Sequence, residues 1–380
     1  MADATSTMTF RAGCETGERI AIAAVGDLLF HNALQRQALT PGGSYRDFWR
    51  SLEPVLAGAD LTYGNLEGPV ADGVSITGGI VRDPGRRWDG NVYGAPRGAL
   101  NFNYHRSVVS DLVASGFDVV STANNHAADR GPHGLDRTVA SLEAGGLPFT
   151  GTRHRKSYPD RRWAVTTKAN GFTVAWIACT YSTNGMPDRH GQVLDCYKHR
   201  DKVFEEIRWN AADPDVDAVI LTPHWGVEKA PSPLKSDRHY ARAAIEAGAT
   251  AIIGTHPHVL QGWEKIATEN GREGLVIYST GNFISNQVSD DQRTGIVAVI
   301  ELTRREAGGK AELSAAGFVP TWVERGRHRV TELQVDRTRG ARGFPAPLRR
   351  LPTGNHVTAA TFRDMPRACP VTASAAPRIK

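Results

Sequence analysis

The run Ile20-Ala-Ile-Ala-Ala-Val25, followed at once by Gly26-Asp27, decides the fold of this chain. Six consecutive apolar residues before a turn are typical of a strand buried on both faces. Similar apolar runs recur at residues 60–63, 117–121, 172–178, 216–221, 251–253 and 275–278, and a closing hairpin is predicted at 296–302 and 311–318. Stretches with helical spacing lie between them, at residues 45–56, 107–115, 134–144 and 237–247. This alternation predicts an α/β fold.

The organisation along the chain predicts one main domain. No repeat or linker divides residues 20–335. Residues 1–19 are polar and lack the cationic start and apolar segment of a signal peptide, so we expect a flexible N-terminus. Residues 336–380 are rich in Arg, Pro and Ala, and we expect a loosely structured C-terminal tail. Residues 72–98, rich in Gly and Arg, are predicted to form a long surface insertion, which is often functional.

Cysteine content and hydropathy bear on the compartment. A chain of 380 residues buries a core without disulfides, and its four cysteines form no CxxC pair. We therefore expect reduced thiols and a cytoplasmic protein, with Cys369 incidental. No stretch of about 18 apolar residues occurs, so no membrane anchor is expected.

The charge is moderately basic, with a net charge of +5. Part of it comes from the clusters Arg86-Arg87, Arg153-His154-Arg155-Lys156 and Arg349-Arg350. A solvated surface is the simpler interpretation, and attraction of a polyanionic substrate is the alternative. No motif for binding nucleic acid accompanies the charge, so we expect no nucleic-acid partner.

Polar side chains follow five of the apolar runs, where the predicted strands end. They are Asp27; Asn65 and Glu67; Asn125 and His126; His224; and His256 and His258. Loops at the carboxyl ends of strands converge on one edge of a sheet. Imidazole and carboxylate ligands suit two divalent ions such as zinc, manganese, iron or nickel, which together lower the pKa of a water between them. An uncoordinated histidine can then protonate a leaving group.

Each of these residues also has a simpler interpretation. Asp27 alone could cap a helix, Asn125 could be a turn residue, and Pro257 could mark an ordinary turn. Their joint occurrence at five strand ends favours the metal centre. His31 stays a candidate because it is close to Asp27 in sequence, and the remaining histidines are expected to be structural or exposed.

Six ordered sequence blocks carry a family resemblance. They are AAVGDLLFH at 23–31, GNLEGPV at 64–70, STANNHAADRGPHGL at 121–135, LTPHWGVE at 221–228, IIGTHPHVLQG at 252–262 and YSTGNF at 278–283. Over residues 20–325 the chain resembles the CapA family of poly-γ-glutamate synthesis and capsule proteins, which is similar to the calcineurin-like metallophosphatases. The resemblance implies a layered metallophosphatase-like β-sandwich flanked by helices, in a single domain.

The resemblance also implies roles. Asp27 matches the first metal-binding carboxylate, and Glu67 takes the place of the bridging one. Asn125, His224, His256 and His258 match further metal ligands, and His126 matches the acid that binds no metal. Two departures stand out. Leu29 occupies the position of an expected histidine, for which His31 is a possible substitute, and Glu67 is one methylene longer than the usual aspartate.

Asp129 and Asn282 are further candidates. Asp129 could orient His126 or cap the following helix, and the two interpretations stay open. Asn282, on a late strand-end turn with Ser279 and Gly281, could line the cleft or simply form the turn.

Three functions follow. The first is a metal-dependent hydrolase or acyl-transfer enzyme acting on a γ-glutamyl-type amide or on an anionic small molecule, peptide or polyglutamate-like polymer. The absence of a GxxxxGK[ST] motif argues against ATP-driven ligation by the P-loop route. The second is a metallophosphoesterase. The third is a non-catalytic component of polyglutamate or capsule synthesis.

Overall fold

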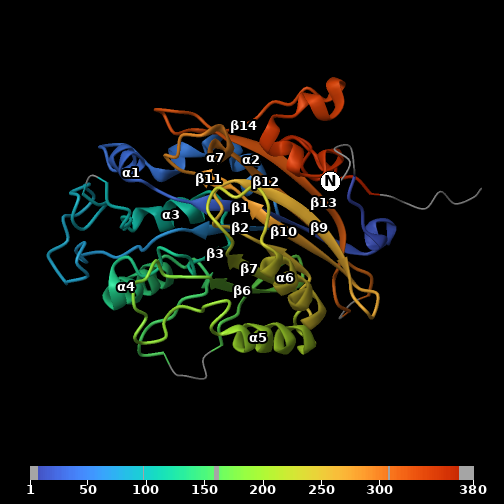
Figure 1. Cartoon of the computed structure of the whole chain (residues 1–380), viewed down its shortest axis with the longest axis horizontal. Helices are drawn as coiled ribbons and strands as arrows, with labels where there is room; N and C mark the ends of the chain where they lie inside the picture. Colours follow the sequence, from blue (N-terminus) through green and yellow to red (C-terminus); the bar gives the residue numbers. More distant parts are fainter. Residues whose placement is uncertain (1–6, 97, 158–161, 307–308, 368–380) are drawn as a thin grey trace, which may run out of the picture.

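The computed structural model describes residues 7–96, 98–157, 162–306 and 309–367. Two β-sheets lie one against the other, and helices cover the outer face of each (Figure 1). The chain is therefore a mixed α/β protein built on two sheets flanked by helices, as the sequence predicts.

The first sheet has the strand order β14-β13-β12-β1-β2-β3-β4, and β11 pairs with the end of β1. β1, β2, β3, β4 and β11 run parallel, whereas β12, β13 and β14 continue the sheet in antiparallel fashion. The strands are β1 Glu18–Leu28, β2 Leu61–Leu66, β3 Val119–Ser121, β4 Phe149–Thr150, β11 Asn282–Ile284, β12 Thr294–Arg304, β13 Glu312–Val323 and β14 Val330–Glu332.

The second sheet has the strand order β5-β6-β7-β8-β10-β9. Its centre is parallel, and the two edge strands β5 and β9 are antiparallel to their neighbours. The strands are β5 Val165–Ala169, β6 Phe172–Thr180, β7 Ala218–His224, β8 Ala251–Ile253, β9 Leu260–Ala267 and β10 Glu273–Thr280.

The helices connect the parallel strands and surround the sandwich. The α-helices are α1 Asn32–Ala38, α2 Glu53–Leu56, α3 Ser107–Ala114, α4 Gly131–Ala144, α5 Arg200–Ala212, α6 Lys235–Ala247 and α7 Asp290–Arg293. The short 3₁₀-helices are η1 Arg11–Cys14, η2 Tyr45–Phe48, η3 Arg50–Leu52, η4 Arg337–Gly343, η5 Ala346–Arg350 and η6 Thr353–Asn355.

Strand β1 shows why the opening apolar run has no polar alternation. Successive side chains of a strand point to opposite faces of its sheet. Ile20 and Ile22 pack between the two sheets, and Ala23 and Val25 pack under the helices. Because both faces of β1 are buried, every position in the run must be apolar.

Gly26 ends this run for a steric reason. A Cβ atom at position 26 would collide with the carbonyl oxygen of Gly281, which accepts a hydrogen bond from the Asp27 N–H at 3.2 Å. This close approach pairs Asp27 with Asn282 of β11. A glycine at position 26 is therefore needed to bring the late strand-end turn beside Asp27.

The helix predicted at 45–56 is not continuous. Residues 45–56 form η2, η3 and the single-turn helix α2. Pro54 lies in the first turn of α2 and has no N–H to offer a preceding turn, so the helix begins again at Glu53. Helices α1, α5 and α7 were not predicted, and the insertion at 72–98 contains neither helix nor strand among its described residues.

Both chain ends are packed where the structure describes them, which corrects the expectation of flexible ends. Phe10 is buried in the core between the sheets, together with Phe344 and Leu348 of the predicted tail. The Asn355 side chain accepts a hydrogen bond from the Met8 N–H at 2.7 Å and donates one to the Met8 carbonyl. The apolar residues of 336–367 were too widely spaced to show helical or strand periodicity, although they fill the core.

The expectation of reduced thiols is wrong for Cys179 and Cys196, which form a disulfide. Cys14 is also disulfide-bonded, and Cys369 lies outside the described residues. Strand β6 and its returning loop bring the pair together, because the Cys196 N–H donates to the Thr180 carbonyl at 2.8 Å. Disulfides are typical of oxidising compartments, so the cysteines no longer support the cytoplasmic expectation.

Replacing both cysteines, Cys179→Ala with Cys196→Ala, should lower the free energy of unfolding. The bond closes a loop between residues 17 apart in sequence. Losing such a cross-link costs about 3 kcal/mol through the entropy of the unfolded chain. Urea denaturation of the double variant measures the loss, and a decrease below about 1 kcal/mol would contradict the expected role of the bond.

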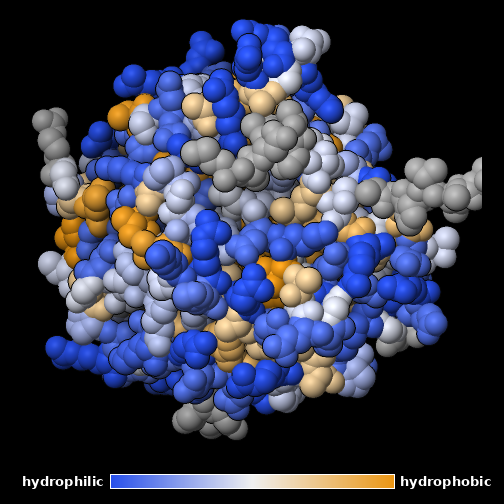
Figure 2. Space-filling model, turned by 45° about the vertical axis from the view of Figure 1, so that its right-hand side comes forward, coloured by the Kyte–Doolittle hydropathy of each residue, from blue (hydrophilic) through white to orange (hydrophobic). Residues whose placement is uncertain are grey.

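Surface hydropathy and helix length bear on contact with a membrane. Figure 2 shows a predominantly hydrophilic face on which hydrophobic side chains lie in small separate groups. Within the described ranges, no helix combines the length and apolar character needed to cross a bilayer.

Candidate metal centre

Strand ends from both sheets meet at one place. Asp27 is the penultimate residue of β1, Glu67 directly follows β2, and His224 ends β7. The nearest carboxylate oxygen of Glu67 lies 3.7 Å from Nε2 of His224 and 3.7 Å from Nε2 of His258. Asp27 Oδ2 lies 3.0 Å from His258 Nδ1, and Asp27 Oδ1 lies 3.9 Å from His224 Nδ1. The fold thus gathers two carboxylates and two imidazoles that are widely separated in sequence.

Three of these side chains form a group that could hold a metal ion. One ligand atom each from Asp27, Glu67 and His224 lies within 4.8 Å of the others, and all three residues are buried. Both carboxylate oxygens of Glu67 are buried without a hydrogen-bond partner among the described residues. Burial, together with the nearby Asp27, raises the pKa of Glu67 well above its usual value. A divalent cation would supply the charge that these oxygens lack.

The histidines offer neutral nitrogens, which is the form that binds metals. Burial and the neighbouring His256 and His258 hold the pKa of His224 well below its usual value. Burial lowers the pKa of His256 to about 3, and its Nδ1 is buried without a partner in the described chain. His258 differs, because Glu67 and Asp27 outweigh its burial and raise its pKa to about 9.

The backbone around Pro257 is unusual. His256 and His258 both have positive φ angles, 99° and 57°, which residues other than glycine seldom adopt. Such conformations persist where the surrounding structure enforces them and are concentrated at functional sites. The two ring centroids are 6.0 Å apart; His258 contacts Asp27, and the His256 ring lies 4.8 Å from the His224 ring.

Three asparagine side chains complete the set. Asn125 Oδ1 lies 2.9 Å from His224 Nε2, and Asn282 Oδ1 lies 2.9 Å from His258 Nδ1. The Asn65 amide donates to Asp27 Oδ1 at 2.7 Å. All three candidate amides therefore contact other candidate ligands.

His126 and Asp129 form a separate pair beside this group. His126 Nδ1 lies 2.9 Å from Asp129 Oδ2, which also accepts a hydrogen bond from the Phe102 N–H at 2.6 Å. The Phe102 ring meets the His126 ring edge to face, with centroids 4.6 Å apart. Helix α4 begins at Gly131 with Arg130 at its N-cap and no side-chain cap. The geometry therefore favours orientation of His126 by Asp129 over the capping interpretation.

His31 is near the centre but outside the Asp27–Glu67–His224 group. Its Nδ1 accepts a hydrogen bond from the Asn286 N–H at 3.3 Å, and burial lowers its pKa to about 4. Leu29, at the position where the family pattern has a histidine, is buried in the apolar core. The structure therefore gives no substitute ligand at position 29 and places His31 beside the site.

Several neighbouring residues were not predicted. Thr255 Oγ1 lies 2.9 Å from His224 Nδ1 and can fix the orientation of that ring. The Tyr181 ring packs on His256 with centroids 4.5 Å apart, and Asn184 accepts a hydrogen bond from the Asn125 amide at 3.3 Å. Thr255 could have been predicted as part of the site, because it directly precedes the candidate ligand His256. Nothing in the sequence indicated that Tyr181 or Asn184 would lie there.

Arg130 holds part of the insertion against the site. It is fully buried, and its guanidinium donates to the carbonyl groups of Asn91, Gly94, Asn101 and Phe102. Because Phe102 contacts both His126 and Asp129, Arg130 positions these residues indirectly.

The variant Arg130→Lys should therefore lose stability and turnover together. A lysine keeps the charge but cannot reach four carbonyl groups with a rigid fork of donors. Each buried carbonyl left without a donor costs about 1–3 kcal/mol. Urea denaturation measures the loss, and Arg137→Lys on the outer part of α4 is the control. Equal stability of the two variants would contradict this role.

Comparison with known proteins places the chain in a family. Residues 21–287 match the family model "Bacterial capsule synthesis protein PGA_cap". The capsule biosynthesis protein CapA of Bacillus anthracis is 26% identical over 78% of this chain and 71% of its own length. The PGA biosynthesis protein CapA of Bacillus subtilis is 27% identical over 69% of this chain and 62% of its own length.

Among solved structures, the NAD nucleotidase of Haemophilus influenzae superposes with a TM-score of 0.46 and 12% identity, covering 86% of this chain and 55% of that one. The family match is the stronger finding. It spans well over half of the chain and includes every candidate ligand from Asp27 to Asn282. The chain therefore belongs to the bacterial capsule synthesis protein PGA_cap family.

Proposed function

We propose that this chain is a hydrolase or acyl-transfer enzyme that uses two divalent metal ions and acts on a γ-glutamyl-type amide of an anionic peptide or polymer. The buried carboxylate of Glu67, which has no hydrogen-bond partner among the described residues, carries this proposal. Such a group is costly unless a cation balances it. The family description and the names of the Bacillus relatives support the substrate class.

The contacts suggest how the ligands are shared. Asp27 pairs with His258, and Asn125 pairs with His224, and both histidines lie near Glu67. Glu67 Oε1 lies 3.7 Å from Nε2 of both histidines, so Glu67 would be the carboxylate shared between the two ions. The ions would supply an activated water and polarise the reacting carbonyl group.

The remaining residues handle protons and orientation. Asp129 holds Nδ1 of His126, so Nε2 of that ring is free to give a proton to the departing amine. Thr255 orients His224 in the same manner. His256, whose ring packs between His224 and Tyr181, would complete the second ligand group.

A phosphoesterase is the second candidate. The Asn125-His126 pair and the His256-Pro-His258 turn match the metallophosphatase motifs, and Asn125 and His256 both contact His224. Phosphoryl transfer needs the same two functions, stabilisation of charge and a proton donor. The centre could therefore act on a phosphoester or on an amide, and the names of the family and its relatives favour the amide.

The test is a comparison of substrates on metal-loaded protein. Turnover of a panel of γ-glutamyl amides is measured beside bis-p-nitrophenyl phosphate, with His126→Ala as the inactive variant and the exposed His133→Ala as its control. Amide cleavage lost in His126→Ala alone supports the proposal, and phosphoester cleavage alone supports the second candidate. If neither substrate class reacts, a non-catalytic part in polymer synthesis becomes the better explanation.

A further inference from the structure

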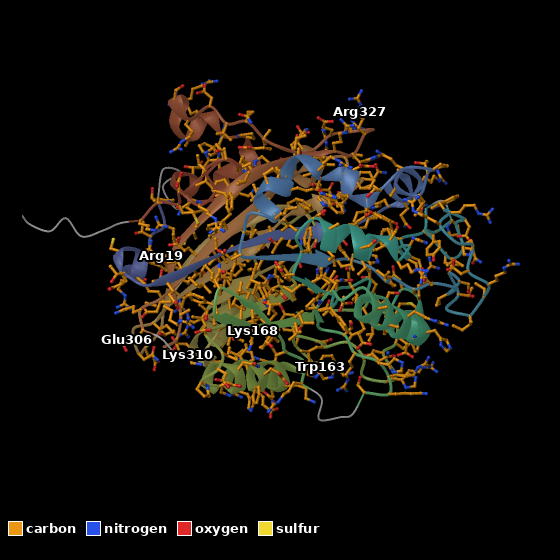
Figure 3. The ribbon with its side chains drawn as sticks, turned by 180° about the vertical axis from the view of Figure 1, so that it is seen from behind. Arg19, Trp163, Lys168, Glu306, Lys310 and Arg327 are labelled. Atoms are coloured by element: carbon orange, nitrogen blue, oxygen red, sulfur yellow. A yellow bond between two sulfur atoms is a disulfide. The ribbon has the colours of Figure 1, made fainter. Side chains whose placement is uncertain are left out.

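The tip of the β13–β14 hairpin carries three arginines whose side chains, within the described part of the chain, are free to bind a ligand. It has the sequence Glu324-Arg-Gly-Arg-His-Arg329 and is called the arginine tip below. Arg325, Arg327 and Arg329 are exposed, and their side chains make no hydrogen bond or ion pair with any residue the structure describes. Figure 3 shows Arg327 at the outer edge of the molecule. The positive charge of these three side chains is therefore available to an anionic partner.

The arginine tip is held in a fixed place. His328 is buried at its centre, with Nε2 2.7 Å from Asn286 Oδ1 and Nδ1 3.4 Å from Gln37 Oε1. The Glu324 N–H donates to the Arg329 carbonyl at 2.8 Å and closes the turn. Because burial keeps the pKa of His328 below its usual value, this residue acts as a neutral clamp. The tip therefore presents its arginines from a preorganised turn.

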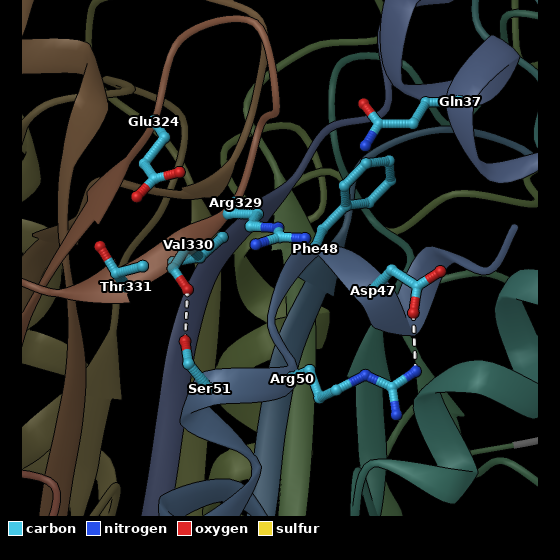
Figure 4. A pocket seen from close by; sticks show the side chains of 9 residues that line it. All are labelled: Gln37, Asp47, Phe48, Arg50, Ser51, Glu324, Arg329, Val330 and Thr331. Atoms are coloured by element: carbon cyan, nitrogen blue, oxygen red, sulfur yellow. Dashed lines mark hydrogen bonds and ion pairs between the residues drawn. The ribbon is translucent and has the colours of Figure 1, made fainter.

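Two hollows flank the arginine tip. The larger, about 670 Å³, contains the Arg329 side chain and also the ion-paired Asp47 and Arg50 (Figure 4). The smaller, about 220 Å³, is lined by residues 285–288, Arg293 and the residues 323–326 and 328. Arg293 stacks on Trp322 at 3.9 Å, and its pKa is lowered by burial and also by repulsion from Arg325. Arg293 and Arg325 thus place two positive charges at the smaller hollow, beside the carboxylate of Glu324.

The smaller hollow is adjacent to the candidate metal centre. Gln287, in its lining, accepts a hydrogen bond from the Asn282 amide at 2.7 Å. Asn282 Oδ1 in turn lies 2.9 Å from Nδ1 of His258. Asn286, which contacts the His328 clamp, also donates its N–H to His31. A single layer of side chains therefore separates the hollow from the metal ligands.

We propose that the arginine tip and the smaller hollow form a subsite for the carboxylates that flank the reacting bond of an acidic polymer. Guanidinium groups bind carboxylates through two parallel hydrogen bonds. Because Gln287 and Asn282 link the smaller hollow to His258, residues beside the reacting bond would lie close to the tip. Acidic polymers repeat their charge, which suits three arginines in one turn. The assignment rests on the proposed function, and it names Arg325, Arg327 and Arg329 as residues that determine specificity.

The test is binding of a fluorescently labelled γ-linked oligoglutamate of about ten residues to the full, metal-loaded chain. The variant Arg325→Gln/Arg327→Gln/Arg329→Gln should weaken binding about tenfold, as expected for three exposed ion pairs. The control Arg337→Gln/Arg339→Gln/Arg342→Gln removes the same three charges from exposed positions of η4. Binding by the control should match that of the unmodified protein, and lysines at 325, 327 and 329 should restore part of the affinity.

Each outcome separates the subsite from the proposed reaction. If the oligomer is a substrate, its KM should rise in the glutamine variant while kcat and the turnover of a small neutral substrate stay unchanged. If nothing is turned over, the proposed function fails but the binding comparison still decides the subsite. Equal weakening by the η4 control, no binding by the unmodified protein, or equal binding of a single-stranded DNA of the same charge would overturn the assignment.

Discussion

Replacing Glu67 by glutamine should strip metal from the protein and yet make the metal-free protein more stable. Glu67 is fully buried, neither of its oxygens has a hydrogen-bond partner among the described residues, and its pKa is raised by burial and by Asp27. The charged form is therefore unfavourable in the folded protein at neutral pH unless a cation is bound. A neutral amide of the same shape removes that penalty, and it is a much poorer ligand for a divalent ion.

The sign of the pH dependence follows from the raised pKa of Glu67. A carboxyl whose folded pKa lies above its unfolded value costs stability at neutral pH, and the cost disappears as pH falls below the unfolded value. The metal-free Glu67→Gln protein should exceed the metal-free parent by on the order of 1 kcal/mol at pH 7, with a difference that shrinks towards pH 4. Calorimetric unfolding at both pH values measures this.

A matched control separates a metal ligand from an ordinary buried carboxylate. Glu301 is also buried, but it accepts hydrogen bonds from Arg367 at 2.6 Å and Ser314 at 2.8 Å. Glu301→Gln should lose stability and leave the metal content unchanged. Elemental analysis should show at most one ion per chain for Glu67→Gln against two for the parent. Unchanged metal content in Glu67→Gln would refute the bridging role.

The fold could be predicted where the chemistry is local. Strand β8 occupies exactly the predicted residues 251–253, and β1 and β6 differ from prediction only at their ends, because continuous apolar runs leave few alternatives. The region 45–56 failed because Pro54 interrupts a pattern whose spacing is otherwise helical. The prediction for the segment after residue 336 failed for the opposite reason, because that segment has no regular pattern at all. Its scattered Phe344, Leu348 and Leu351 have no periodicity, and only the sheet they cover shows what they do.

The candidate metal ligands could be predicted from their positions at strand ends, but the residues that surround them could not. Asp27, Glu67 and His224 end or follow strands, so sheet topology alone draws them together. Phe102 and Tyr181 come from irregular segments whose path depends on distant contacts, such as the carbonyl groups held by Arg130. The disulfide was equally hidden, since the spacing of Cys179 and Cys196 does not show that a loop returns to β6.

The second large effect is expected at His126. The variant His126→Ala should reduce kcat by about 10²–10⁴-fold, the usual contribution of a positioned general acid. Metal content should not change, because His126 contacts Asp129 and Phe102 and is not one of the three clustered ligands. Steady-state kinetics with metal analysis on the same samples measures both, and loss of metal in His126→Ala would show that this residue is a ligand instead.

Asp129→Asn tests whether Asp129 acts through His126. The asparagine still accepts the Phe102 N–H, but it no longer offers a charged partner to the imidazole, so kcat should fall about 10–100-fold. In the His126→Ala background the same substitution should have little further effect, since residues that act as a unit are not additive. If the two losses multiply, Asp129 acts independently of His126, and their 2.9 Å contact has only a structural purpose.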